Sequence, residues 1–243
     1  MDKDNLLIEL FTEELPPDSI EILAKELGNT ISQELLSRKL INEIDFKSFA
    51  TPRRLAVYVK AVNIKAEDET KLIKIMPYSV GFDEDNKPTQ PLIKKLQSID
   101  KAIKIKELEV IEEKNKKFIY ISKKFKGCKL EDELNSIIKN SLQQLSIKKN
   151  MSYQLNDGWT TVDFVRPMRG LITLHGGKVL NSNILGCHAS NKTFGHRFES
   201  TKEIITIKHA DDYEKILENE GKVIACFNKR KTKIKVDIKT ALT

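Results

Sequence analysis

Apolar positions near the beginning of the chain predict a buried strand followed by a long helix. Residues 6–11 are almost entirely apolar and predict a strand, which ends at two acidic residues and two prolines. From residue 18 to about residue 39, apolar side chains recur at helical spacing. Asp18, with Glu21 three residues later, predicts a capping box at the start of this helix.

Two strands are predicted next, over residues 44–50 and 55–62. In the second, alternation places three apolar side chains on one face: Leu55, Val57 and Val59. The turn between the strands carries Pro52 and the pair Arg53-Arg54. Residues 66–90 have little periodicity and are rich in turn-forming residues, so they predict a long connection with at most one short strand.

Beyond this connection the pattern alternates between helices and hairpins. A short helix is predicted over residues 91–98, then a hairpin of strands 107–111 and 118–124. The most regular amphipathic helix of the chain covers residues 130–145. Strands are predicted over the ranges 161–165, 171–175 and 179–185, and the Gly176-Gly177 pair forms a tight turn between the last two.

The end of the chain predicts a strand over residues 203–208, a helix over 211–220 and a Lys-rich helix from about residue 224. Strands come in hairpin-like clusters rather than in strict alternation with helices. This order predicts an α+β fold with a mixed, mostly antiparallel sheet, packed helices and a final basic helix. Four regions are predicted: a βαββ region over 1–65, a connecting segment over 66–90, a second α+β region over 91–221 and the start of a basic helical region over 222–243.

Composition narrows the class of protein. The 243 residues carry a net charge of +7, yet 35 of the 42 basic residues are lysines spread along the chain. The charge is uneven, because residues 1–26 hold eight acids against two lysines and residues 222–239 hold seven bases against one acid. The longest apolar runs fall far short of the ~20 residues of a membrane span, and no basic and apolar leader opens the chain. A cytoplasmic protein is expected.

Familiar catalytic and metal-binding patterns are absent from the sequence. The three cysteines show no CxxC spacing, and Cys187 and His188 are neighbours whose side chains would point apart in a strand. No Gly-rich phosphate loop, nucleophile elbow or HExxH motif occurs. We therefore expect no metal, no ATP site and no catalytic residue in this chain.

Five segments occur in an order that carries a family resemblance: FTEELPP at residues 11–17, ATPRRLAV at 50–57, DFVRPMRG at 163–170, GHRF at 195–198 and GKVIACFNKRKTKIK at 221–235. Together they resemble the amino-terminal part of the β subunit of the bacterial two-subunit glycyl-tRNA synthetase. The resemblance covers essentially the whole chain. Two segments depart from the family pattern, MPYS at residues 76–79 and the pair Cys226-Phe227.

The resemblance implies a division of labour between subunits. In that family the α chain activates glycine with ATP and Mg²⁺, while the β chain binds tRNA and completes an assembly of two α and two β chains. The family's β chain is several hundred residues longer, and its HD-type and anticodon-binding regions would lie beyond Thr243. The chain is thus expected to be a front portion of such a subunit, ending inside a helical pattern.

Candidate RNA contacts are the arginines and one histidine inside these motifs, together with the basic helix. Arginine grips phosphate with a planar fork that lysine lacks. The candidates are Arg53, Arg54, Arg166, Arg169, His196, Arg197, Lys229, Arg230, Lys231 and Lys233. The alternatives are structural ion pairs for the arginines and a solvated face for the helix. At least one of Arg53 and Arg54 is predicted to pair with an acid, with Glu13 and Glu14 as candidates.

Three functions remain open at this stage. The first is a module that contacts tRNA and assembles with the α subunit, and the second is a purely structural interface. The third is an editing hydrolase, suggested only by analogy with editing regions of phenylalanyl-tRNA synthetase β chains. Editing would require an acid, base or metal that the sequence does not supply, and glycine is smaller than every rival amino acid.

Overall fold

The apolar run near the start of the chain forms the centre of a sheet. Strand β1 (Lys3–Thr12) pairs antiparallel with β3 (Arg54–Asn63) on one side and with β9 (Met168–His175) on the other. Its side chains enter two different apolar clusters, Leu6, Ile8 and Leu10 in one and Leu7 in the other. Burial on both faces explains why the run is nearly continuous rather than alternating.

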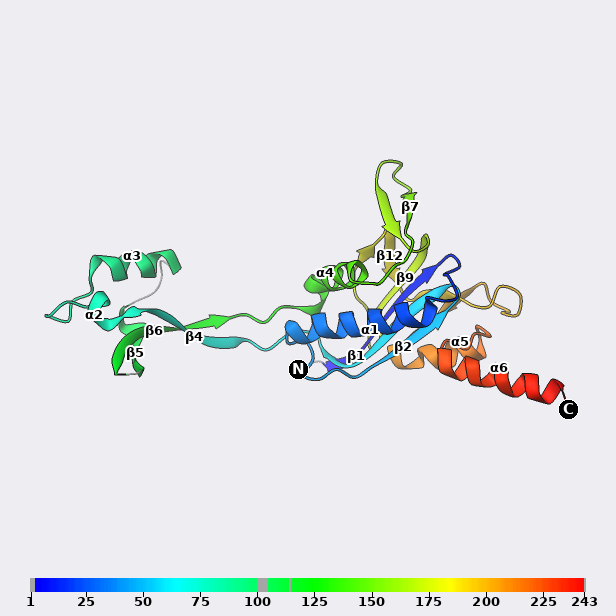
Figure 1. The fold of residues 1–243 in the computed structure, drawn as a ribbon, viewed down its shortest axis with the longest axis horizontal. Helices are drawn as coiled ribbons and strands as arrows, with labels where there is room; N and C mark the ends of the chain where they lie inside the picture. Colours follow the sequence, from blue (N-terminus) through cyan, green and yellow to red (C-terminus); the bar gives the residue numbers. More distant parts are fainter. Residues whose placement is uncertain (1–2, 100–104, 114, 243) are drawn as a thin grey trace. The chain divides into compact units, whose positions relative to one another are not determined.

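The computed structural model describes residues 3–99, 105–113 and 115–242, which form two compact units (Figure 1). The larger unit contains Met1–Ala66 and Cys128–Thr243, and the smaller unit is Glu67–Gly127. The large sheet has the order β11-β12-β9-β1-β3-β2, with β10 also paired to β9. Its remaining strands are β2 (Phe46–Thr51), β10 (Lys178–Val179), β11 (Asn183–Ile184) and β12 (Cys187–Ser190).

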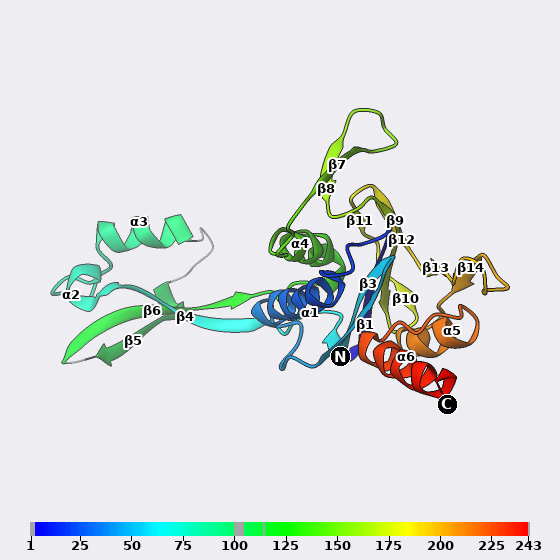
Figure 2. The same ribbon diagram turned by 45° about the vertical axis from the view of Figure 1, so that its right-hand side comes forward.

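All pairings in this sheet are antiparallel except that of β12 with β9. The predicted α+β class with a mixed, mostly antiparallel sheet is therefore confirmed. Helices α1 (Ile20–Ser37) and α4 (Leu130–Gln143) pack on one face, with the cluster that holds Leu55, Val57 and Val59 (Figure 2). Helix α5 (Tyr213–Asn219) covers the other face, and the chain's last described helix is α6 (Phe227–Ala241).

The predicted capping box of α1 does not form. The helix begins at Ile20, and no side chain caps its first turn. Asp18 is engaged elsewhere, because one carboxylate oxygen accepts from Ser19 Oγ at 3.1 Å and the other from Lys148 Nζ at 2.9 Å. An ion pair distant in sequence has thus replaced the local cap.

The smaller unit contains a three-stranded antiparallel sheet in the order β4-β6-β5. Its elements are β4 (Glu69–Pro77), α2 (Tyr78–Gly81), α3 (Gln90–Ile99), a short 3-10 helix (Ile105–Glu107), β5 (Leu108–Glu113) and β6 (Lys116–Phe125). Leu92 and Leu96 of α3 pack on Ile119 and Ile121 of β6. The predicted helix over residues 91–98 and the hairpin that follows it along the chain are confirmed in type and place.

The predicted long connection over residues 66–90 is wrong for its first half. Strand β4 has nine residues, followed by the one-turn helix α2. Lysines and a threonine interrupt its apolar residues, and its partner β6 lies far along the chain, so local periodicity is weak. The strand exists because long-range pairing satisfies its backbone, not because its own pattern demands it.

Several short strands were also missed in the larger unit. Strand β7 (Met151–Gln154) forms a hairpin with the predicted β8 (Thr161–Phe164), and β13 (Lys192–Phe194) pairs with the predicted β14 (Ile204–Thr206). The predicted strand over 179–185 is two separate two-residue strands, β10 and β11. Trp159, at the tip of the β7–β8 hairpin, is 90% exposed.

Gly28 marks a close approach of α1 to β2. A Cβ at this position would lie 2.2 Å from Phe46 Cε2. Replacing Gly28 with alanine improves helix propensity, yet overpacking against the ring should dominate and lower the free energy of unfolding by about 1–2 kcal/mol. Urea titration tests this, with Asn29→Ala on the exposed side of the same helix as a control expected to be neutral or slightly stabilising. A rise in stability for Gly28→Ala would contradict the packing argument.

No helix in the described ranges is long and apolar enough to cross a membrane.

Candidate nucleic-acid interface

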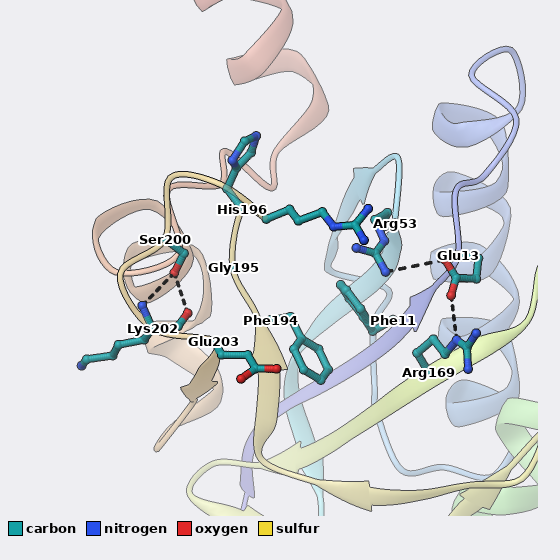
Figure 3. A pocket seen from close by; sticks show the side chains of 11 residues that line it. Phe11, Glu13, Arg53, Arg169, Phe194, Gly195, His196, Ser200, Lys202 and Glu203 are labelled. Atoms are coloured by element: carbon teal, nitrogen blue, oxygen red, sulfur yellow. Dashed lines mark hydrogen bonds and ion pairs between the residues drawn. The ribbon is translucent and has the colours of Figure 1, made fainter.

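Two hollows adjoin each other on the larger unit, where β1 ends and the β2–β3 turn meets the loop after β13. Both are lined by Phe11, Arg53 and the segment 195–197. The first hollow, of about 600 Å³, also includes Glu13, Arg169 and Lys202 (Figure 3). The second hollow, of about 440 Å³, extends to Phe198, to residues 222–224 and to Arg230 of α6. The fold thus gathers residues from five segments that are distant in the sequence.

Glu13 joins two of the predicted arginines in the first hollow. Its carboxylate lies 3.6 Å from Arg53 Nη2 and 2.7 Å from Arg169 Nε, as the dashed lines of Figure 3 show. The Arg53 guanidinium also lies over the Phe11 ring, 5.1 Å from its centroid. The predicted pairing of Arg53 with Glu13 is confirmed. One carboxylate shared by two guanidiniums leaves an excess of positive charge.

Arg54 differs from the other candidates because it is buried, only 2% exposed. Its Nε lies 3.4 Å from Glu9 Oε2 without hydrogen-bond geometry, while Nη2 donates to the Phe194 carbonyl. The acid is therefore Glu9, not Glu13 or Glu14. Arg54 differs from the other predicted RNA contacts because its guanidinium is buried and contacts Glu9 and the Phe194 carbonyl inside the protein.

Glu9 is the centre of this buried polar cluster and is 1% exposed. The hydroxyl groups of Thr193 and Tyr213 each donate to one of its carboxylate oxygens. Burial raises the pKa of Tyr213 well above its ordinary value, and the nearby Glu9 charge acts in the same direction. The cluster ties β1 and β3 to β13 and α5, and thereby fixes the base of both hollows.

The second hollow holds cations that no carboxylate neutralises. Within the described parts of the chain, Arg197, Lys222 and Arg230 form no ion pair. Arg230 Nη1 donates to the Ile224 carbonyl at 2.8 Å, which holds the guanidinium at the hollow. Burial lowers the pKa of Arg230, and the Arg54 charge adds to this effect. The exposed Glu14 is the one carboxylate that lines this hollow.

The other candidates lie apart or are already paired. Arg166 lines a separate hollow beside Lys148 and Lys149, and its Nη1 donates to the Val165 carbonyl at 2.7 Å. On α6, Lys229 pairs with Glu218, and Lys233 lies 3.2 Å from Asp237. Lys231 is exposed. Of the basic helix, Arg230 alone among the predicted residues lines either hollow.

His196 acts as a local acceptor. Its Nδ1 receives the backbone N–H groups of Phe198 at 3.3 Å and Glu199 at 3.2 Å, which shapes the loop after β13. No group of three or more His, Cys, Asp or Glu side chains suited to a metal occurs among the described residues. Phe198 and Lys222 also line the second hollow but were not among the predicted site residues, although Phe198 ends the GHRF motif and Lys222 lies within the quoted segment 221–235.

Comparison with known proteins identifies the family. The sequence profile described as glycyl-tRNA synthetase beta subunit matches residues 6–243. The chain belongs to the glycyl-tRNA synthetase beta subunit family. It is 38% identical over 243 residues to the glycine–tRNA ligase beta subunit of Nitrosomonas eutropha, covering 99% of this chain and 34% of that protein.

Two further beta subunits of glycine–tRNA ligase agree with this assignment. Identity is 38% over 240 residues with the protein of Nitrosomonas europaea and 39% over 237 residues with that of a Janthinobacterium species. These alignments cover 98% and 96% of this chain, and 34% of each relative. The chain therefore spans about a third of the length of these beta subunits, and the resemblance carried by its motifs is confirmed.

Proposed function

We propose that this chain supports aminoacylation of tRNA(Gly) in the cytoplasm, as part of the beta subunit of a glycine–tRNA ligase. It binds tRNA and assembles with the catalytic α subunit in a complex of two α and two β chains. ATP and Mg²⁺ act through the α subunit, and this chain contributes no catalytic residue or cofactor. The family assignment supports this role, since its members are named beta subunits of that ligase.

The observation that carries the tRNA-binding part is the unneutralised charge of the second hollow. Arg197, Lys222 and Arg230 line it with Arg53, whose carboxylate partner Glu13 is shared with Arg169. A cationic concave surface attracts the RNA backbone and releases its counterions on binding. Guanidinium groups add the bidentate geometry that suits phosphate oxygens.

A purely structural interface is the second candidate, and α6 favours it. Ile234, Val236 and Ile238 are each more than half exposed on this helix. Apolar side chains gathered on one exposed helix are suited to contact with another protein surface. The two roles are compatible, because the apolar residues lie beyond Arg230 along α6.

A salt titration of tRNA(Gly) binding tests the proposal. Between about 50 and 200 mM salt, the logarithm of the association constant should fall linearly with the logarithm of the salt concentration. Arg197→Ala should make this slope shallower by about 0.7–0.9. Arg166→Ala is the matched control, because its guanidinium lines a different hollow.

Two outcomes would contradict the tRNA-binding role. One is an absence of salt-dependent tRNA binding by the chain, alone and with the α subunit. The other is an Arg197→Ala variant with the wild-type slope that no longer co-elutes with the α subunit, which would favour the interface.

A further inference from the structure

We propose that the second hollow holds one unpaired nucleotide of an RNA, with its base against Phe198 and its phosphate among Arg53, Arg197 and Arg230. This inference rests on the proposed tRNA-binding function and specifies the part of the RNA that the site takes. The pairing of an exposed aromatic ring with unneutralised guanidiniums carries it.

Phe198 presents a free aromatic face at the rim of the hollow. Phe198 is 86% exposed, and its ring lies edge-on to that of His196, with centroids 6.3 Å apart. The backbone N–H of Phe198 donates to His196 Nδ1, so the loop that carries the ring is held in place. An exposed phenyl ring forgoes the free energy of burial, and a nucleobase stacked on it would recover that energy in a sequence-tolerant way.

The lining of the hollow has an apolar part and a cationic part, which complement the aromatic base and the anionic phosphate of a nucleotide. Pro52, Val223 and Ile224 supply apolar surface, while Arg53, Arg197 and Arg230 supply charge. A volume of about 440 Å³ falls within the usual range of small-ligand sites, roughly 300–1,000 Å³. The hollow is therefore of a size suited to one nucleotide.

Arg53 is already positioned for an anion. The Phe11 ring and the Glu13 carboxylate hold its guanidinium from two sides. Its Nε is buried and has no hydrogen-bond partner among the described residues. Because Nε is buried, an anion in the hollow would meet the rest of this side chain, which is 35% exposed as a whole.

The geometry favours an unpaired nucleotide over a duplex. In an A-form helix the bases are stacked on one another and the major groove is too deep and narrow for side chains to read. Their faces are therefore inaccessible to Phe198, whereas single-stranded segments and ends expose them. An acceptor end, a loop or a bulge would each present the required group.

Fluorescence anisotropy with two probes tests this site on the 243-residue chain: a single-stranded oligoribonucleotide of about 12 nucleotides, and the same strand annealed to its complement. The wild type should prefer the single strand. Phe198→Ala should weaken single-strand binding about 10-fold, the scale of one base stacked on an aromatic side chain, and leave the salt slope unchanged because the ring is neutral. Phe198→Trp, which keeps an aromatic ring, should bind the single strand with about the wild-type affinity.

Trp159→Ala is the matched control, since Trp159 is equally exposed but lines neither hollow. Equal affinity of wild type and Phe198→Ala for the single strand would overturn the nucleotide site while leaving tRNA binding by the arginines intact. Loss of co-elution with the α subunit in Phe198→Ala, without loss of RNA affinity, would instead make Phe198 a protein contact. No binding of tRNA(Gly) by the wild type would refute the proposed function itself.

Discussion

Replacing Arg54 with alanine is expected to lower the free energy of unfolding by about 3–5 kcal/mol. The variant would leave the Glu9 carboxylate, 1% exposed, without its guanidinium partner in the core. An uncompensated buried charge is far more costly than the net gain from forming the pair. The loss also removes the hydrogen bond to the Phe194 carbonyl, which should loosen the loop that lines both hollows. Urea titration followed by circular dichroism measures the change.

The double variant Glu9→Gln with Arg54→Met removes both buried charges while keeping most of the side-chain volume. In the wild type, Thr193 and Tyr213 donate to different carboxylate oxygens of Glu9. The glutamine oxygen can still accept from one of these hydroxyl groups, and its NH2 group can donate to the oxygen of the other. Methionine fills much of the volume of arginine without a charge. The double variant should therefore be more stable than Arg54→Ala alone. If the two were equally destabilised, the hydrogen bond to the Phe194 carbonyl, which both variants lack, rather than an unpaired charge would be the cause.

Replacing Arg53, Arg197 and Arg230 together with alanine is expected to weaken tRNA(Gly) binding about 100-fold near 0.1 M salt. The estimate follows from three phosphate contacts, each of which contributes about 0.7–0.9 to the slope of log affinity against log salt. The slope should accordingly become shallower by about two to three units. Filter binding at several salt concentrations gives both quantities.

A second triple variant controls for net charge. Lys25, Lys60 and Lys178 already pair with Glu21, Asp45 and Glu131 and line neither hollow. Their replacement with alanine also removes three positive charges but should change the affinity for tRNA(Gly) much less. Equal losses in the two variants would mean that only total charge matters and that the hollow is no binding site.

The sequence predicts helices and strands correctly where the apolar pattern of the segment itself defines the element. The order β1, α1, β2 and β3 follows from apolar runs and helical spacing within each of these segments. Strand β4 and the parallel strand β12 could not be predicted, because each has little periodicity of its own and is defined by its pairing with another strand. Local pattern carries no information about such partners.

The candidate site was predictable in part for a similar reason. The motifs identified Arg53, Arg169, Arg197 and Arg230, but not which of their neighbours neutralise them. Glu9 could have been recognised, since a single carboxylate inside the apolar run of residues 6–11 must be paired if that run is buried. The separation of Arg166 from the other arginines depends on tertiary structure alone.

The path of the chain into and out of the smaller unit has an evolutionary consequence. Residues 64–66 and 128–130 are held together by backbone hydrogen bonds, Ala66 to Cys128 at 2.9 Å and Leu130 to Ile64 at 2.9 Å. The two chain ends at which the smaller unit is inserted are thus held together by the larger unit's own hydrogen bonds. A tight turn could therefore connect them in place of residues 67–127. Insertions and deletions between these ends need not disturb the arginines of the two hollows, so descendants of one ancestral gene could vary here in length while keeping the proposed RNA-binding surface unchanged.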